Sequence, residues 1–384
     1  MSSLTDDLLI EILTRMSDYR DCPFYYRDLA KFPSYDLFSE ASKILHGQSS
    51  TRTTSPGKYL DFLGWPNPIV RASDKDLLLL ERTPLQFYIC NPLTKQSVAL
   101  PEAPPCKYLS FGFVCESNGG STSTSTSTST STSTSTSVVI KYRVVLITSR
   151  CNNWQFPNVM FSFSSETGEW KQLRPSFRKR KRNRLFQSLL NWDDKGIVCN
   201  GVMYRLLSYY YKKYEAIVAF DPFEVEKRAC RFISFPAECY HGIERKRGVP
   251  CLGLVRGRLR LSLSFWYGTE PGFTLKAWEL SLRHDDPDHH QDTWALVQNV
   301  KVNVTLNLAV MTYLIGLHPE DADVFFFLDE KAGIIYNYQS GKDGFEKVGD
   351  ILDRTESFYS VQVFTLAHPW LPTKIPALPT LPRV

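Results

Sequence analysis

Short runs of apolar residues, separated by turn-forming residues, dominate the chain from Tyr59 to about Ala367. In each run, β-branched and aromatic residues precede a polar turn and a second, usually shorter apolar run, as in FYICNPLTKQSVALP and VFFFLDEKAGIIYNY. Two such runs joined by a short polar turn are typical of a β-hairpin. The pattern therefore predicts a mainly β domain over residues 59–367.

The hairpins recur along this domain. Their polar turns are at Asn91, Glu166, Asp221, His284 and Asp329, at intervals of 75, 55, 63 and 45 residues. The first interval contains the tract Ser121–Ser137, and without it 58 residues remain. A repeat of this size is close to the roughly 40–50 residues of a four-stranded propeller blade. We predict a β-propeller-like domain, with an irregular β-sandwich as the alternative.

The first segment of the chain has a different pattern. In LTDDLLIEILTRM (Leu4–Met16), six apolar residues fall on one half of a helical wheel and most of the polar residues fall on the other. Thr5 can cap the helix, and two aspartates follow where the helix dipole favours carboxylates. The pattern predicts an amphipathic helix within a small helical module over residues 1–45. Its apolar stripe would pack either on the β domain or in the groove of another protein.

Three polar or proline-rich segments separate or follow these units. Residues 46–58 are rich in Ser, Thr and Gly and are expected to be a linker. The Ser/Thr insert, over residues 117–137, cannot bury apolar surface and is expected to be a disordered loop between strands. Residues 368–384 carry a proline every few positions and are expected to be an extended, polyproline-like tail.

Composition narrows the possible classes of protein. The net charge of +5 is too small for the whole molecule to act as a polyanion binder, so nucleic acid is not expected as a partner. No apolar run approaches the roughly 20 residues of a membrane-spanning helix, so no membrane is expected either. The nine cysteines are odd in number and include no C-x-x-C pair, which favours a reducing compartment over a disulfide framework or a zinc module.

The segment LTDDLLIEILTRM resembles the opening of an F-box, whose usual pattern is Leu-Pro-x-Asp-Leu-x-x-Glu-Ile-Leu-x-Arg-Leu-Pro. Two later segments resemble the F-box-associated, kelch-like β domain of plant F-box proteins: FYICNPLTKQSVALP, and the unit from Lys195 to Pro236. The second half of the F-box is divergent, since it has one Cys, no Trp, and prolines at Pro23 and Pro33 that would interrupt helices.

This resemblance implies a substrate-recognition adaptor of an SCF-type cullin–RING ubiquitin ligase. The F-box would dock on a Skp-type adaptor, and the β domain would capture an unidentified target protein for ubiquitination. Carried over by position, the adaptor-binding residues would be Leu4, Leu8, Ile12, Leu13 and Met16. Such a protein is not an enzyme and needs no cofactor.

Two polar clusters are further candidate sites. A basic run is a candidate nuclear-import signal, which leads us to expect the protein in the nucleus, the cytoplasm or both. Its charged members are Arg178, Lys179, Arg180, Lys181, Arg182 and Arg184. The second cluster, HDDPDHH (residues 284–290), has ligand types that suit a divalent metal, but Pro287 and its polar surroundings favour a solvated hairpin tip, so no metal site is expected.

Four common active-site motifs are absent: the chain has no Walker A loop, no H-E-x-x-H, no G-x-S-x-G and no G-x-G-x-x-G. Paired carboxylates for glycoside chemistry stay open, because their pairing is spatial and the chain has many candidates. Aromatic residues, 13% of the chain, are better candidates for ligand capture. Two alternatives to the ligase adaptor stay open. One is a β-propeller enzyme or carbohydrate-binding module, and the other is a degenerate F-box protein that no longer couples to a ligase.

Overall fold

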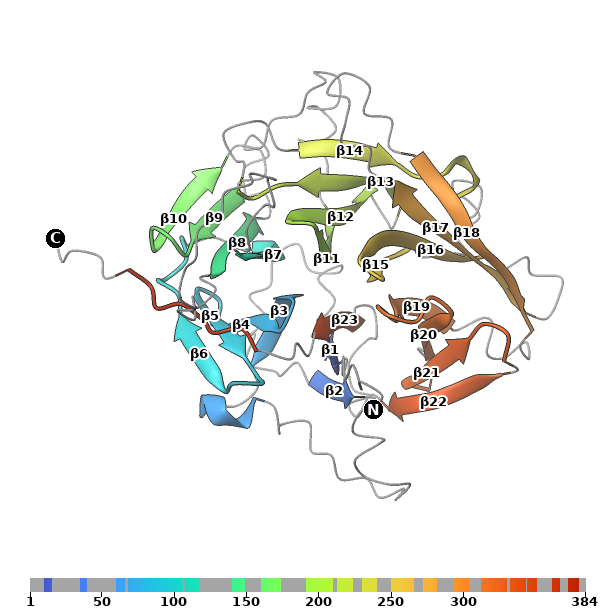
Figure 1. Cartoon of the computed structure of the whole chain (residues 1–384), viewed down its shortest axis with the longest axis horizontal. Coiled ribbons are helices and arrows are strands. Elements are labelled where there is room, and N and C mark those ends of the chain that lie inside the picture. The colour runs from blue at the N-terminus through green and yellow to red at the C-terminus, as the bar shows by residue number, and fades with distance from the viewer. Residues whose placement is uncertain are drawn as a thin grey trace, which may run out of the picture.

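Five antiparallel sheets of four strands each stand around a central axis, and their colours follow one another around the ring from blue to red (Figure 1). The computed structural model describes residues 10–15, 35–39, 60–65, 68–105, 108–117, 140–148, 160–173, 191–209, 213–223, 230–239, 250–265, 272–281, 293–303, 312–329, 332–342, 344–350, 361–366 and 372–379. Each sheet is built from strands that are consecutive in the sequence, which is the arrangement of propeller blades.

The five blades are numbered in chain order, and the first-named strand of each lies nearest the axis. Blade 1 comprises β3 (Ile69–Asp74), β4 (Leu77–Thr83), β5 (Gln86–Asn91) and β6 (Gln96–Ala99). Blade 2 comprises β7 (Tyr108–Ser117), β8 (Ile140–Thr148), β9 (Met160–Ser164) and β10 (Glu169–Leu173). Blade 3 comprises β11 (Asn191–Cys199), β12 (Val202–Tyr209), β13 (Lys213–Phe220) and β14 (Cys230–Ser234).

Blades 4 and 5 complete the series of four-stranded sheets. Blade 4 comprises β15 (Cys251–Val255), β16 (Arg258–Phe265), β17 (Phe273–Ser281) and β18 (Thr293–Val302). Blade 5 comprises β19 (Thr312–Leu317), β20 (Val324–Asp329), β21 (Ile334–Gln339) and β22 (Phe345–Asp350). The predicted propeller is confirmed, and the irregular β-sandwich was the wrong alternative.

A three-stranded sheet, which we call the closing sheet, lies between blade 5 and blade 1 (Figure 1). Its central strand is β1 (Ile10–Arg15), which pairs antiparallel with β2 (Tyr35–Ser39) on one side and β23 (Val361–Leu366) on the other. Residues from the two ends of the sequence therefore meet in one sheet.

The helix predicted for Leu4–Met16 is not found where the structure describes this segment, because Ile10–Arg15 is a strand. Isoleucine and threonine are β-branched and fit a strand at least as well as a helix. Two neighbouring strands also supply backbone partners to Ile10–Arg15 on both edges, and such tertiary pairing overrides local helix propensity. Within the described residues, helical structure is limited to a 3-10 turn at Asp61–Leu63 (η1) and to residues 237–239.

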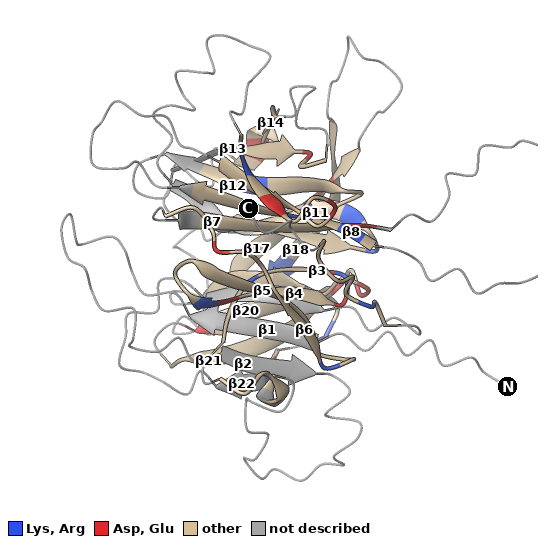
Figure 2. Cartoon of the chain, turned by 90° about the vertical axis from the view of Figure 1, so that its left-hand side faces the viewer, with Lys and Arg blue, Asp and Glu red and all other residues tan. Residues whose placement is uncertain are grey.

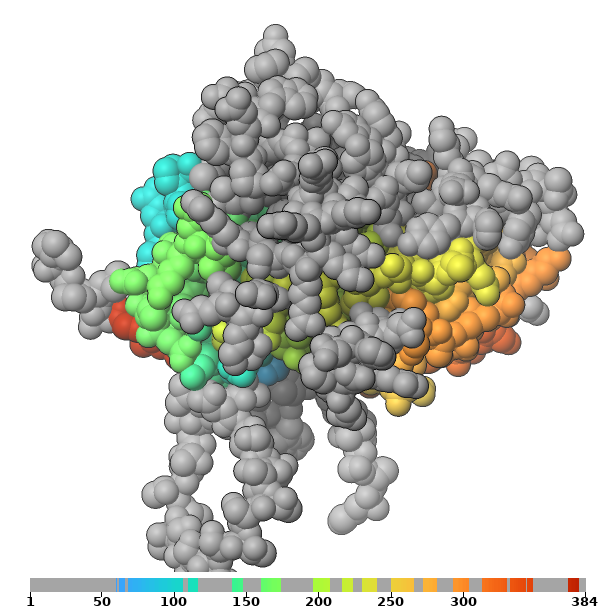
Figure 3. All heavy atoms as spheres, turned by 90° about the horizontal axis from the view of Figure 1, so that it is seen from above, coloured from blue at the N-terminus to red at the C-terminus, as the bar shows by residue number. Residues whose placement is uncertain are grey.

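The hydrophobic core is divided between the blades. One cluster of buried apolar side chains fills each of the four interfaces between consecutive blades, and a fifth covers the outer face of blade 1. Seen from above, the coloured atoms of consecutive blades form a continuous band from cyan to orange (Figure 3). A blade that has a cluster on each of its two faces can have a second strand that is apolar at every position, because neither face of that strand meets water.

Strand β4 shows this double burial at residue level. Leu77 and Leu79 belong to the cluster between blades 1 and 2, whereas Leu78 and Leu80 pack in the cluster on the opposite face. All four are fully buried. A run of four leucines is therefore a strand whose alternate side chains enter two different cores.

Candidate functional site

In the four blades where the structure describes it, the first turn, between the innermost and second strands, contacts a neighbouring blade. We call the described examples the turn ring: residues 74–77 in blade 1, 199–202 in blade 3, 255–258 in blade 4 and 317–324 in blade 5. Cys199 Sγ of blade 3 donates to the Gly257 carbonyl of blade 4 at 3.4 Å. The turn ring is therefore a set of loops held at fixed positions by contacts between blades.

Three non-glycine residues of the turn ring adopt a left-handed backbone. They are Lys75, Asn200 and Arg256, with φ of 57°, 51° and 50°. Asn200 and Arg256 are each followed by a glycine with positive φ, as a two-residue type I′ hairpin requires. A lysine or arginine at such a position is unusual, and backbone outliers of this kind cluster at functional sites. Both basic side chains are exposed at the ring.

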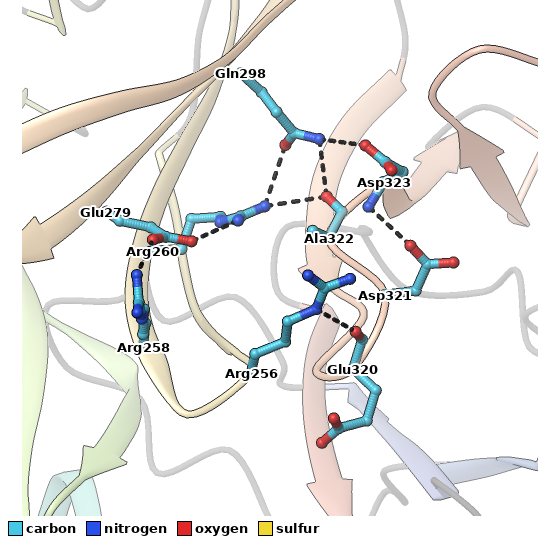
Figure 4. Close-up of polar contacts among 9 residues, drawn as sticks. All are labelled: Arg256, Arg258, Arg260, Glu279, Gln298, Glu320, Asp321, Ala322 and Asp323. Atoms are coloured by element: carbon cyan, nitrogen blue, oxygen red, sulfur yellow. Dashed lines mark hydrogen bonds and ion pairs between the residues drawn. The ribbon is translucent and has the colours of Figure 1, made fainter.

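Arg256 fastens the turn of blade 4 to the loop of blade 5. Its backbone N–H donates to the Pro319 carbonyl at 2.5 Å, and its Nε donates to the Glu320 carbonyl at 3.1 Å (Figure 4). In that loop, His318 Nδ1 accepts the Asp321 N–H at 2.8 Å. The loop that carries the acidic residues of blade 5 is thus ordered by blade 4.

A buried arginine anchors the same pair of blades from within. Arg260 on β16 lies directly opposite Glu279 on β17, and its Nη2 donates to Glu279 Oε1 at 2.6 Å. Its Nη1 donates to Gln298 Oε1 at 3.1 Å and to the Ala322 carbonyl at 3.0 Å. Only 5% of the Arg260 side chain is exposed, so this charge is compensated inside the protein.

The Gln298 amide extends the network to the acidic loop. Gln298 Nε2 donates to the Ala322 carbonyl at 2.9 Å and to Asp323 Oδ1 at 2.7 Å (Figure 4). On blade 4, Arg256 and Arg258 are exposed, and on the neighbouring loop of blade 5, Glu320 and Asp323 are exposed. Arg256 bonds to the backbone of Glu320, whereas Arg258 pairs with Glu279 (Figure 4). Elsewhere on the described strands, basic and acidic segments are interspersed (Figure 2). A rigid surface of both charges suits recognition of a protein surface better than binding of a polyanion.

Blade 1 contributes a half-buried aspartate, Asp74, to the turn ring. Asp74 Oδ2 accepts the backbone N–H of Cys115 on blade 2 at 2.6 Å. Burial raises the pKa of Asp74 from its ordinary 3.8 to about 6, against the lowering effects of the Cys115 hydrogen bond and the Lys75 charge. The neighbouring Asp76 carboxylate raises this pKa further. Asp74 therefore binds a proton more tightly in the folded chain than in the unfolded chain.

We expect Asp74→Asn to change how stability depends on pH. Between pH 3.8 and about 6 the folded chain holds more protons than the unfolded chain, so Asp74 contributes stability at low pH that is lost as pH rises through this window. The loss is up to about 3 kcal/mol for a shift of this size. The asparagine keeps an oxygen for the Cys115 N–H and does not titrate. Urea unfolding at pH 4 and pH 8 should show a smaller fall in the variant, and equal falls would contradict this account.

The described residues contain no group of three or more His, Cys, Asp or Glu side chains that could hold a metal ion. The six cysteines that the structure describes are buried and are not joined in disulfides. Burial raises the pKa of Cys90, Cys230 and Cys239 to about 12, so these thiols stay protonated and are poor nucleophiles. No helix in the described part of the chain is long and apolar enough to cross a membrane.

The candidate sites inferred from the sequence lie mostly elsewhere. Ile12 and Leu13 are on β1 in the closing sheet, where their backbones pair with β2 and β23. Leu4, Leu8 and Met16 lie outside the described residues. The basic run 178–184 and the histidine-rich segment 284–290 also lie outside them, so the import signal and the hairpin tip stay predictions.

Family comparison decides what kind of propeller this is. Residues 40–360 match the family described as "F-box protein At3g26010-like, beta-propeller", which is well over half of the chain. The chain belongs to this family. The resemblance to F-box proteins is therefore confirmed at the level of family and propeller. Proteins of the At3g26010-like F-box family have a substrate-adaptor role in general.

Further comparisons add little to the At3g26010-like family assignment. No curated protein matches the chain. Among solved structures, a chain of an S. cerevisiae complex of Dbp5 with Nup159, Gle1, IP6 and ADP matches at 12% identity and a TM-score of 0.33, covering 84% of this chain and 74% of that chain. The N-terminal domain of Nup159 matches at 10% identity and a TM-score of 0.32, covering 84% and 72%.

The turn ring and the Arg260 network were missed by sequence reasoning, although a signal for the turns exists. The segments CNGVMYRL and VRGRLRL share a strand end, a left-handed residue followed by glycine, and an alternating strand. Aligning blades of this At3g26010-like propeller on these first turns would have brought Asn200 and Arg256 together. The partners of Arg260 lie on another strand and another blade, so no spacing in the sequence predicts them.

Proposed function

We propose that the chain is a substrate-recognition adaptor of an SCF-type cullin–RING ubiquitin ligase, in which the propeller captures the protein to be ubiquitinated. The observation that carries this proposal is the family match over residues 40–360, which spans all five blades. Such an adaptor works by proximity: it holds a target beside the ubiquitin-conjugating enzyme and raises the effective concentration of the two reactants. This mechanism needs no catalytic group in the chain itself.

The turn ring is the surface that we propose for target capture. Its loops are fixed by hydrogen bonds between blades, so little conformational entropy is lost when a partner binds. Its exposed arginines and carboxylates are on the first turns of two neighbouring blades, 4 and 5. This arrangement permits charge pairing in a defined register with a protein surface.

Coupling to the ligase is proposed through Leu4, Leu8, Ile12, Leu13 and Met16, the residues that match the F-box docking face. Docking as a helix requires Ile10–Arg15 to leave strand β1, because a strand paired on both edges cannot present a helical face. Adaptor binding through this helix and pairing of β1 in the closing sheet would then exclude each other. A specific observation therefore favours a second candidate function, a propeller adaptor that binds its target without reaching a ligase.

Co-purification with the Skp-type adaptor separates the two functions. We expect the full chain to retain the adaptor, and Leu8→Asp combined with Ile12→Asp to abolish retention, because two buried charges remove the apolar docking face. Arg256→Glu in the turn ring is the matched control and should leave adaptor retention unchanged. A folded full chain that never retains the adaptor, while it still binds target proteins, would replace the ligase function by the second candidate.

A further inference from the structure

The segment after β23 forms a strap across two blades. Residues 372–379 run without helix or strand, and in Figure 1 the red trace crosses blade 1 from the centre of the ring outward. At one end Thr373 bonds to blade 1, and at the other end Pro379 lies against Gly168 in the β9–β10 turn of blade 2. Six residues in an extended polyproline conformation span about 19 Å, so a short segment is able to reach from one blade to the next.

Two buried polar side chains of blade 1 hold the backbone of Thr373. Asn91 Nδ2 donates to the Thr373 carbonyl at 2.7 Å, and Asp76 Oδ2 accepts the Thr373 N–H at 2.6 Å. Both side chains are on fully buried residues. Because Asn91 and Asp76 bond only to backbone atoms of Thr373, this contact does not depend on the side chain at position 373.

Side chains farther along the strap supply the apolar contacts. Ile375 and Leu378 are half-buried and pack against the same core cluster as Trp170, whereas Lys374 and Ala377 are exposed. Inward residues therefore recur at a spacing of three, which is the period of a polyproline II helix. The sequence continues this spacing, since IPALPTLPR consists of three successive triplets of Ile or Leu, Pro and a variable residue.

The site beneath the strap is organised by contacts that do not involve the strap. Asn91 Oδ1 accepts the backbone N–H groups of Leu93 and Thr94 at 2.9 and 3.3 Å, and Asn91 Nδ2 also donates to Asp76 Oδ2 at 2.9 Å. Trp170 Nε1 donates to the Pro101 carbonyl at 3.0 Å. Asp76 Oδ1 is buried and has no hydrogen-bond partner, so the strap leaves one acceptor of the site unused.

We propose that the surface formed by Asp76, Asn91, Gly168 and Trp170, which we call the strap site, binds polyproline-type peptides with repeated Ile/Leu-Pro-x triplets, and that residues 372–379 occupy it until a partner's segment displaces them. The partner is a protein with an exposed proline-rich segment of this pattern. The strap site shares no residue with the proposed adaptor-docking face, so this inference goes beyond the proposed function and does not depend on ligase coupling.

A peptide with the sequence of residues 371–384 tests the proposal by fluorescence anisotropy. The full chain with Ile375→Ser and Leu378→Ser, whose own strap has lost its apolar anchors, should bind the labelled peptide at least tenfold more tightly than the unmodified chain. A control peptide with Asp in place of Ile375, Leu378 and Leu381 should not bind. Adding Asn91→Ala to the strap variant should remove binding, with folding of each variant checked by its thermal unfolding.

Hydrogen exchange on the unmodified chain decides the question even if the variants fold poorly. An excess of the same peptide, made with heavy isotopes so that its fragments differ in mass, should accelerate exchange in residues 370–384 as the strap is displaced. Faster exchange supports the proposal. Unchanged exchange, together with no peptide binding to the folded strap variant, would overturn the proposal. Equal peptide binding to the unmodified chain and to the strap variant would also overturn it, because the peptide would then occupy another surface.

Discussion

Replacing Arg260 by alanine is expected to lower the free energy of unfolding by about 3–5 kcal/mol, the range found when one partner of a buried ion pair is removed. Arg260 is 4% exposed and compensates Glu279, whose side chain is only 17% exposed. The variant leaves that carboxylate without its close partner and removes one of the donors to the Ala322 carbonyl on blade 5. Equilibrium urea unfolding at neutral pH measures the loss.

Arg258→Ala is the matched control, because Arg258 also pairs with Glu279 but at 3.5 Å and with a side chain that is 74% exposed. An exposed pair of this kind contributes at most about 1 kcal/mol. The double variant Arg260→Met with Glu279→Leu should recover part of the loss, since no uncompensated carboxylate remains. Equal losses for Arg258→Ala and Arg260→Ala would show that the network does not hold blades 4 and 5 together.

Phe327→Ala is expected to have an effect of similar size, about 3–5 kcal/mol, because it empties the centre of the cluster between the same two blades. Phe327 is fully buried on β20. Its ring centroid lies 5.4 Å from that of Phe273 on blade 4 and 5.4 Å from that of Phe345 on β22. The loss should appear as a lower urea midpoint with a similar slope.

Leu296→Ala on β18 provides the comparison, since Leu296 is 45% exposed and its truncation should change stability by no more than about 0.5 kcal/mol. Phe327→Leu, which keeps most of the apolar volume, should fall between the two. If Phe327→Ala is no worse than Leu296→Ala, the cluster between blades 4 and 5 is not the packed core that its burial indicates.

The propeller could be predicted from the sequence because its strands are joined by local hairpins. The turns at Asn91, Glu166 and Asp221 each end the third strand of a blade, so they mark equivalent positions. Asp329 instead ends the second strand of blade 5, and the equivalent turn of that blade is near Gly341. This difference explains why the interval from His284 to Asp329, 45 residues, is shorter than one blade, whereas the other intervals are close to one blade in length.

The closing sheet could not be predicted, because its strands pair across almost the whole sequence. The segment Ile10–Arg15 has an apolar pattern that satisfies a helix and β-branched residues that satisfy a strand. Pairing with β23 decides between the two, and periodicity contains no information on that partner. Local sequence patterns predict hairpins between neighbouring strands, but they do not predict pairing between strands that are far apart in the sequence, such as β1 and β23.

The functional surfaces were predicted less well than the fold. Arg260, Gln298 and Asp76 are ordinary residues in the sequence, and their roles come from neighbours on other strands, on another blade or on the C-terminal strap. The frequent prolines of residues 368–384 predicted an extended tail. That the segment packs on blades 1 and 2 is a property of the folded chain alone.

Pairing of β1 with β23 has a consequence for biosynthesis. Translation releases the chain from its N-terminus, so β1 has no β23 to pair with until residues 361–366 have been synthesised, about 350 residues later. Blades 1 to 5 contain only sequence-local pairings and can assemble while the ribosome is still working, whereas the ring must be sealed afterwards through a contact of very high sequence separation. During that interval the nascent propeller exposes the edge of β1 that later pairs with β23, and an unpaired strand edge is a template for association with another chain.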